Sequence, residues 1–269
     1  MQIRILLLCC AGALLAVRVS AEPLDLQHYR LVDLTHAYDK DTVFWPSGPT
    51  HFDLKRLHYG ETDAGFFYSA NTFCTPEHGG THLDAPIHFA RDRQTAEQVP
   101  LERLVGPVVV IDVSDKAAAE RDYRVTPEDV LAFEAKHGRI ESGMRVLVRT
   151  GWSRRWPDAT AYLGHATDAA KLHFPSYGAE AARLLVEERK VALLGIDTAS
   201  IDYGPAPDFP VHRIAAAANV PGLENITGLE AMPPRGAILL ALPMKIAGGS
   251  GGPTRVVALV PREAATATR

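Results

Sequence analysis

Five short runs rich in Val, Ile and Leu constrain the fold of this chain more than any other feature of its sequence. Turn residues bound each run, and together they cover 106–113, 144–150, 191–198, 237–244 and 255–260. Runs of this length and composition are typical of strands, and the most apolar of them are expected to be buried on both faces of a sheet.

Two helices are predicted between these strands. Residues 126–138 begin with Thr126 as N-cap and Pro127 in the first turn, and Gly138 follows the end. Residues 178–190 form the second helix. This alternation predicts an α/β fold with a mixed sheet in a single domain.

The remaining sequence fits that single domain. Residues 51–59 alternate partly between polar and apolar side chains, which suggests antiparallel strands. With 269 residues, 46% of them hydrophobic, the chain has enough material for one sizeable core. We therefore expect residues 22–269 to fold as one unit.

The first 21 residues have the pattern of a secretory signal peptide. Arg4 precedes an apolar run at 5–17, and the small residues Val-Ser-Ala at 19–21 fit a cleavage site. That run is shorter than the ~20 residues that cross a bilayer, so an uncleaved anchor is the weaker alternative. We expect cleavage after Ala21, export to the periplasm or beyond, and no membrane contact afterwards.

Charge and cysteine content narrow the function classes. The formal net charge of −4 gives the chain no electrostatic attraction to nucleic acid or to an anionic membrane surface. Signal cleavage would leave Cys74 as the single cysteine, so an internal disulfide framework is excluded.

Residues 78–89, HGGTHLDAPIHF, hold three histidines and an aspartate. The two adjacent glycines would each cost a helix about 1 kcal/mol, so an extended segment is predicted. Side chains alternate along an extended chain. Because His78, His82, Asp84 and His88 all have even numbers, they are expected to point to one side. Pro86 cannot donate to a sheet ladder, so it is expected to end or bend the strand before His88.

Imidazole nitrogen and carboxylate oxygen are ligands of zinc and manganese. Two histidines and one aspartate would leave positions open for water or substrate, which is typical of a catalytic site. The alternative is that these histidines are loop residues satisfied by hydrogen bonds. That reading suits a lone histidine better than three with an aspartate within eleven positions.

The same stretch resembles the H-x-G-T-H-x-D-x-P-x-H signature of the cyclase family of metal-dependent hydrolases, which includes kynurenine formamidases and isatin hydrolases. The glycine, threonine and proline positions agree as well as the ligands. The segments FWP (44–46), GIDTASIDYGPAPDFPVHR (195–213) and PGLENITGL (221–229) also resemble family segments. The resemblance covers most of the chain from about Leu31 onward, and it implies the swivelling β/β/α fold.

The resemblance implies a metal-ligand set. His78, His82 and Asp84 match the ligands of the first ion, and His212 and Glu224 match those that complete a second site in two-metal members, with Asp84 and Glu224 bridging. Two alternatives stay open, since Glu224 could cap its own segment and His212 could bind substrate. The resemblance therefore implies one or two divalent ions per chain, Mn²⁺ or Zn²⁺.

It also implies residues around the substrate. His88 matches the residue that moves protons in catalysis, and Trp45 matches an aromatic that contacts the substrate, with Phe44 beside it. Phe66 and Phe67 are further candidate pocket walls. Family members form homo-oligomers, so a dimer or a dimer of dimers is expected, with a neighbouring subunit contributing to the pocket.

The predicted activity is hydrolysis of an amide C–N bond in a small aromatic substrate by metal-activated water, as in the conversion of isatin to isatinate. An arylformamidase of tryptophan catabolism, acting on N-formylkynurenine, is the alternative. The phrase SIDYGPAPDFPVHR and the expected export both favour the isatin-hydrolase branch.

Two readings from other classes remain. An exported ligand- or metal-binding protein without turnover would leave His88 without a role. A serine hydrolase is disfavoured because no G-x-S-x-G elbow occurs, and Ser250 in GGSGG (248–252) is expected to lie in a flexible loop. Asp197, Ser200 and Asp202 receive no site role, and Asp197 is as well explained by satisfying a neighbouring backbone.

Overall fold

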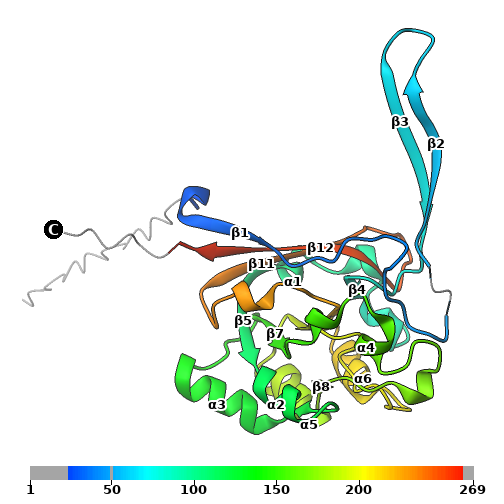
Figure 1. The fold of residues 1–269 in the computed structure, drawn as a ribbon. Helices are drawn as coiled ribbons and strands as arrows, with labels where there is room; N and C mark the ends of the chain where they lie inside the picture. Colours follow the sequence, from blue (N-terminus) through cyan, green and yellow to red (C-terminus); the bar gives the residue numbers. More distant parts are fainter. Residues whose placement is uncertain (1–23, 49–50, 263–269) are drawn as a thin grey trace, which may run out of the picture.

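The computed structural model describes residues 24–48 and 51–262, and its main feature is an eight-stranded mixed sheet (Figure 1). The strand order is β1-β12-β11-β5-β7-β9-β10-β4, and β12 pairs with β4 as well. The sheet therefore closes into a barrel that leaves β1 outside the ring. The strands are β1 Tyr29–Asp33, β4 His82–Asp84, β5 Val105–Asp112, β7 Arg145–Arg149, β9 Leu193–Ile196, β10 Gly222–Glu224, β11 Ala237–Pro243 and β12 Gly251–Pro261.

Each of the five apolar runs forms a strand, namely β5, β7, β9, β11 and β12. The pairs β5–β7, β7–β9 and β9–β10 are parallel, whereas the other pairs of this sheet are antiparallel. The prediction of an α/β fold with a mixed sheet is confirmed.

Alternation along the strands builds two cores. In β5, Val109 and Ile111 belong to the cluster under the helices, whereas Val108 and Val110 belong to the cluster inside the barrel. Successive side chains of a strand point to opposite faces, so a strand that is apolar throughout can supply both cores. The continuous Val and Ile run of β5 is explained by burial on both sides.

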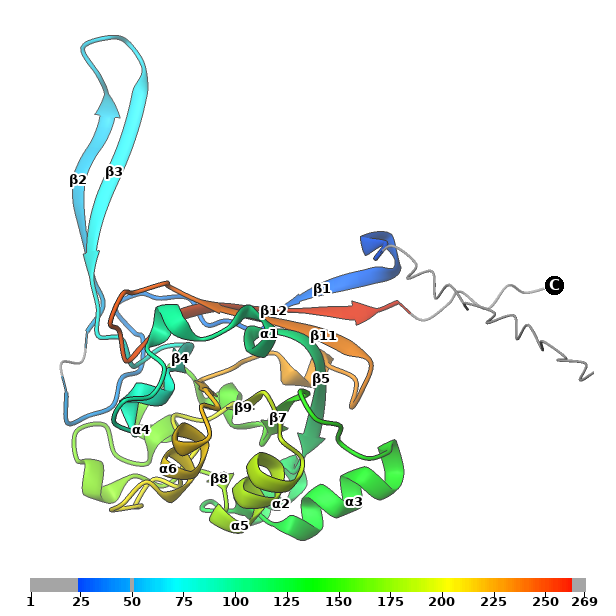
Figure 2. The same cartoon turned by 180° about the vertical axis from the view of Figure 1, so that it is seen from behind.

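The predicted helix 126–138 forms as α3, Pro127–His137, with Thr126 and Asp129 in a capping box. The predicted helix 178–190 begins as α5, Ala179–Arg183, and continues as the π-helical turn η6, Leu184–Glu188. The other α-helices are α1 Leu101–Leu104, α2 Ser114–Ala119, α4 Ala159–Leu163 and α6 Pro210–Ala217. Helices α2, α3 and α5 lie together on the side of the sheet away from β1 (Figures 1 and 2). Short 3-10 turns are η1 Leu26–His28, η2 Pro86–His88, η3 Ala96–Gln98, η4 Trp152–Arg155, η5 Ala169–Lys171 and η7 Leu229–Ala231, and β6 Arg124–Val125 pairs with β8 Ser176–Tyr177.

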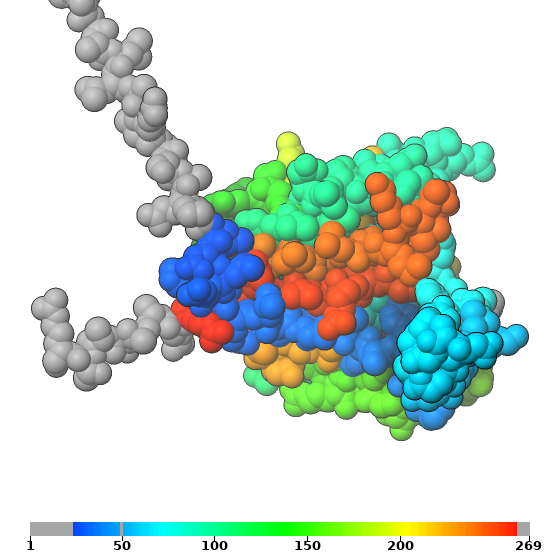
Figure 3. All heavy atoms as spheres, turned by 90° about the horizontal axis from the view of Figure 1, so that it is seen from above, coloured from blue at the N-terminus to red at the C-terminus, as the bar shows by residue number. Residues whose placement is uncertain are grey.

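The antiparallel strands predicted near 51–59 form a hairpin of their own. Strands β2, Asp53–Glu61, and β3, Phe67–Cys74, pair with each other and project from the body (Figures 1 and 2). Figure 3 shows the hairpin end-on, at one corner of the body. It exposes large apolar side chains, namely Leu54, Leu57, Tyr59, Phe66, Phe67, Tyr68 and Phe73.

Within the described residues, no helix is both long enough and apolar enough to cross a bilayer. The predicted signal peptide, residues 1–21, lies outside the described part of the chain.

Candidate metal and catalytic site

Strand β4 forms the floor of the site. It pairs with β10 so that His82 faces Glu224 across the ladder, and Asp84 faces Gly222. His82, Asp84 and Glu224 lie on one face of these two strands, whereas Leu83, between the first two, joins the core inside the barrel. Strand alternation thus brings two predicted ligands and Glu224 together.

The expectation of an extended segment was wrong for His78, whereas the expected end of the strand before His88 is confirmed. Only residues 82–84 form a strand, and His78 reaches the site through a turn in which Gly79 and Gly80 have φ of 137° and 59°. A Cβ on Gly79 would lie 2.1 Å from Phe44 Cδ1, so the turn requires glycine for space as well as conformation. Pro86 starts the 3-10 turn that carries His88 back over the site.

Helix α6 supplies His212 from the opposite side. Asp202 accepts hydrogen bonds from the backbone N–H groups of Val211 and His212, at 2.8 and 3.0 Å, and holds the first turn of the helix. Its Oδ2 also lies 2.7 Å from His212 Nδ1. Asp202, left unassigned from sequence, therefore orients the imidazole so that Nε2 points into the site.

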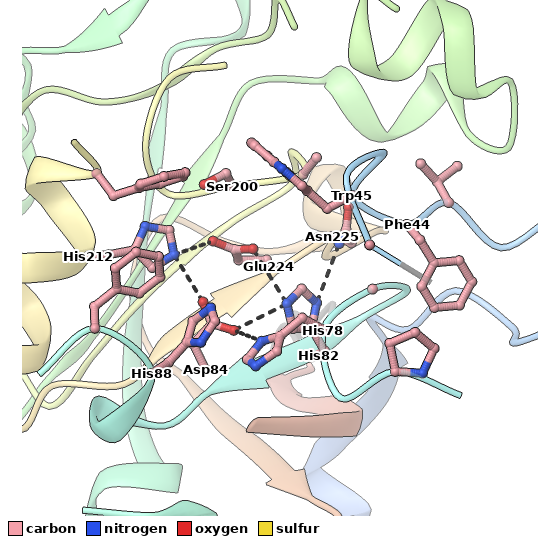
Figure 4. Close-up of a pocket in the computed structure, with 17 residues that line it drawn as sticks. Phe44, Trp45, His78, His82, Asp84, His88, Ser200, His212, Glu224 and Asn225 are labelled. Carbon is pink, nitrogen blue, oxygen red and sulfur yellow. Dashed lines mark hydrogen bonds and ion pairs between the residues drawn. The ribbon is translucent and has the colours of Figure 1, made fainter. Parts of the chain in front are cut away.

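Two groups of donor atoms share Asp84 (Figure 4). In the first, Asp84 Oδ1 lies 2.6 Å from His78 Nδ1 and 3.2 Å from His82 Nε2. In the second, His212 Nε2 lies 3.0 Å from Asp84 Oδ2 and 3.1 Å from Glu224 Oε1. Glu224 Oε2 also lies 3.5 Å from His82 Nε2, so its carboxylate spans both groups.

The other ring nitrogen of each histidine is engaged outside the cluster. His82 Nδ1 lies 3.0 Å from the Gly80 carbonyl oxygen, His212 Nδ1 contacts Asp202, and His78 Nε2 lies 2.8 Å from Ser250 Oγ. Histidines that bind a metal ion are oriented in this way by a partner on the second nitrogen. The donor set and its orientation fit a divalent cation.

Charges in the site are strongly coupled. Burial opposes protonation of His82, but the carboxylates of Asp84 and Glu224 outweigh it and raise the pKa of His82 to about 8. Burial likewise disfavours the charged form of Asp84, yet His78 and His212 hold its pKa well below the usual range. The hydrogen bonds to Asp202 and Asp84 raise the pKa of His212 despite its burial. Such buried carboxylates require compensating positive charge, which protons or a metal ion can supply.

His88 stacks on His78, with ring centroids 3.8 Å apart and planes 15° from parallel. Burial lowers the pKa of His88 to about 4, so its imidazole is neutral near pH 7 and able to accept a proton. His88 lines the pocket above the donor cluster without belonging to either group of donor atoms.

A cavity of about 350 Å³ opens over the donor atoms. Trp45 and Phe44 line it, as does Ser200. Two further aromatics line it that sequence reasoning missed, Phe89 and Phe209, whose rings lie 5.1 Å apart. Phe89 directly follows His88, and Phe209 lies three positions before His212, so proximity to predicted site residues was the available signal.

The proposed walls Phe66 and Phe67 do not line this cavity. They lie at the end of the β2–β3 hairpin and remain more than half exposed. Asp197 takes a structural role, because its carboxylate accepts hydrogen bonds from Thr150 and Gly151 at the end of β7. Burial raises the pKa of Asp197 to about 6.

Comparison with known proteins places this geometry in context. A profile of the family described as "Putative cyclase" matches residues 32–203. Isatin hydrolase of Roseibium aggregatum is 36% identical over 206 residues, which are 74% of this chain and 77% of that protein. Kynurenine formamidase of Salinibacter ruber is 27% identical over 227 residues, 84% and 96% of the two chains.

A solved structure extends the likeness to three dimensions. Isatin hydrolase A from Labrenzia aggregata, bound to benzyl benzoate, matches with a TM-score of 0.81 at 35% identity, over 88% of this chain and 95% of that one. The fold is thus shared over most of both chains.

Proposed function

This chain belongs to the cyclase family, and from that premise we propose that it is a metal-dependent hydrolase that opens the ring of isatin to isatinate by cleaving its amide C–N bond. One observation supports this proposal more strongly than any other. The His78, His82 and Asp84 donor atoms converge at the base of an aromatic-lined cavity, with His88 beside them. A planar aromatic amide of isatin's size suits a cavity of about 350 Å³.

The residues present suit manganese or zinc. His78 Nδ1, His82 Nε2 and Asp84 Oδ1 would hold the ion, a nitrogen and oxygen set that both metals accept. A divalent ion there supplies electrophilic activation of water and of the amide carbonyl. The first group alone supplies two imidazole nitrogens and one carboxylate oxygen, which suffice for one ion with open positions, and we propose a single ion per chain.

The chain's own residues would bind substrate and move the proton. His88, neutral near pH 7, takes a proton from the attacking water at one ring nitrogen and delivers it to the departing amide nitrogen. Trp45 and Phe209, with ring centroids 6.1 Å apart, present aromatic surface to the planar substrate. Glu224 and His212 face the same space, where they would orient the water and the carbonyl group.

A formamidase acting on N-formylkynurenine is the second candidate, because the relatives include kynurenine formamidases. Both activities need the same metal and proton chemistry, so the discriminating experiment is a substrate panel. Purified protein with its metal content measured is assayed with isatin and N-formylkynurenine. Faster turnover of isatin supports the proposal, faster deformylation supports the alternative, and no turnover with manganese or zinc bound would leave a binding protein.

We also propose that the chain forms a homodimer through the β2–β3 hairpin. An isolated two-stranded hairpin is marginally stable in water, and this one exposes large apolar side chains along its length. A second copy that packs against the hairpin would bury them. Two of the side chains that this contact would bury are Leu57 and Phe67, which are 62% and 54% exposed.

Export remains a proposal that rests on the amino-terminal sequence. Expression of the full chain in a bacterial host, followed by amino-terminal sequencing of the periplasmic fraction, is expected to find Glu22 as the first residue. Full-length protein confined to the cytoplasm would rule export out.

A further inference from the structure

The glycine-rich stretch 248–252 lies against His78. Ser250 Oγ is 2.8 Å from His78 Nε2 and 2.6 Å from Glu77 Oε2, and the Ser250 backbone N–H donates to the same carboxylate oxygen at 3.0 Å. Glu77, Ser250 and His78 thus form a hydrogen-bond relay, which runs from a carboxylate through a serine hydroxyl to the imidazole of a proposed metal ligand. Neither Glu77 nor Ser250 has been assigned a role so far.

The expected loop before a strand forms at residues 248–250, and hydrogen bonds fix its position. The Ser250 carbonyl oxygen accepts from the backbone N–H of Ala85, at 2.8 Å, directly after Asp84. A Cβ on Gly251 would lie 2.7 Å from His78 Cε1, and one on Gly249 would lie 2.7 Å from Glu77 Oε1. Side chains at these positions would collide with the relay, so the glycines allow the backbone to press against His78 and Glu77.

The hydrogen-bond chain has a defined direction. A serine hydroxyl carries one proton, and the Glu77 carboxylate accepts but does not donate, so Ser250 donates to Glu77. Ser250 Oγ must then accept from His78, which places the imidazole proton on Nε2. When an ion replaces the hydrogen bond between His78 Nδ1 and Asp84 Oδ1, the lone pair of Nδ1 is left for the ion. The relay selects the tautomer that a metal ion at the first cluster requires.

We propose that Glu77 and Ser250 are positioning residues of the metal site, which act through His78 by fixing its Nε2–H tautomer and the orientation of its ring. The inference rests on the proposed metal site and adds two residues to it. Partners of this kind on a ligating histidine typically contribute 10- to 100-fold to metal affinity.

The matched control is a carboxylate of turn η3 that contacts the same stretch. Glu97 Oε2 accepts from the Gly248 backbone N–H at 3.0 Å, so it anchors the loop through a carboxylate without reaching His78. Glu97→Gln tests loop anchoring alone, whereas Ser250→Ala and Glu77→Gln break the relay. Comparable melting temperatures of the metal-free variants would establish that all of them fold.

The test is calorimetric titration of zinc into chelator-stripped protein without substrate. We expect Ser250→Ala and Glu77→Gln to raise the dissociation constant for zinc by about 10- to 100-fold. The dissociation constant of Glu97→Gln should match that of wild type. Nitrogen-15 spectra of the histidine rings in the zinc-loaded protein are expected to show His78 protonated at Nε2 in wild type and in Glu97→Gln.

Two results would overturn the inference. One is wild-type affinity in both relay variants, or an equal loss in Glu97→Gln, and the other is a His78 proton on Nδ1. If the wild-type protein itself bound no zinc or manganese, the proposed function would fail first, so the two failures can be told apart.

Discussion

Asp84 Oδ2 and His212 Nε2 lie 3.0 Å apart although 128 positions separate the two residues in the sequence. Asp84 is fixed by strand β4, and His212 by helix α6 and its contact with Asp202. The site is therefore assembled only when the barrel and the helix that packs on it are both in place, and its chemistry depends on the fold as a whole.

His88 is expected to be needed for turnover but not for metal binding. Because it contributes no donor atom to either cluster, His88→Ala should retain the wild-type metal content while kcat falls by about 10²- to 10⁴-fold, the usual contribution of a general acid–base group. Elemental analysis and steady-state kinetics on one preparation provide the measurement. Loss of metal together with activity would show that His88 is a ligand instead.

The number of bound ions is a separate prediction. We expect one divalent ion per chain in wild type and in His212→Ala, and none in His82→Ala, because the first cluster carries the ion. Native mass spectrometry after exposure to manganese or zinc gives the stoichiometry. Two ions in wild type and one in His212→Ala would contradict the single-ion proposal and favour the two-metal arrangement.

Trp45 is expected to act on substrate binding. Loss of an aromatic contact costs roughly 0.5–1.5 kcal/mol, so Trp45→Ala should raise KM about 2- to 13-fold with a smaller change in kcat. Trp45→Phe keeps an aromatic ring, so its KM should lie between those of wild type and Trp45→Ala. Since Trp45 also contacts the buried Phe174, melting temperatures must accompany the kinetics. An unchanged KM in Trp45→Ala would remove Trp45 from the substrate site.

His36 is expected to make stability sensitive to acid. Burial lowers the pKa of His36 to about 4 in the folded chain, below the value of about 6.5 for an exposed histidine. Between these pH values the unfolded chain binds a proton that the folded chain does not. The contribution of His36 to the free energy of unfolding is thus fully present above pH 6.5 and is lost progressively as pH falls toward 4.

The variant His36→Phe removes the titrating group and keeps a ring on Trp156, whose ring centroid lies 4.2 Å from that of His36. The free energy of unfolding of this variant, measured with urea from pH 7 to pH 4.5, should then fall less steeply than that of wild type. Replacement of the exposed His28 by Gln is the control and should follow the wild-type curve. Equal slopes for His36→Phe and wild type would refute the assignment.

The hairpin is expected to control assembly. The double variant Leu57→Lys and Phe67→Lys should be monomeric by light scattering on a sizing column and should keep the circular dichroism spectrum of the folded chain, because both side chains are exposed within the chain. Leu101→Lys, at an exposed apolar position on helix α1, is the matched control and should remain dimeric. Persistence of the dimer in the hairpin variant would place the interface elsewhere.

Much of the fold follows from local sequence rules. The apolar runs of β5 and β7 and the capping signals of α3 depend on neighbours within a few residues, so their elements are predictable from periodicity and capping. Barrel closure is different. It depends on β12 pairing with β4, more than 160 positions away, and no local pattern encodes that contact.

The site shows the same division. His82 and Asp84 share a face because strands alternate, and that rule was available from the sequence. His78 reaches the site by a glycine turn, for which alternation was the wrong rule. His88 reaches it by a 3-10 turn that begins at Pro86, where the proline predicted that the strand ends or bends. Ser250 was missed because its partners Glu77 and His78 lie more than 170 positions away.

Strand β12 is the last strand of the described chain, and it pairs with β1, β11 and β4. During synthesis it leaves the ribosome after every other element of the barrel. Until Gly251 and the residues beyond it are available, β4 lacks one of its two neighbours and His78 lacks the hydroxyl beside its ring. A chain that ends before Ser250 therefore lacks both the β12–β4 pairing that closes the barrel and the hydroxyl that orients His78. The proposed ion site is complete only after β12 has been synthesised.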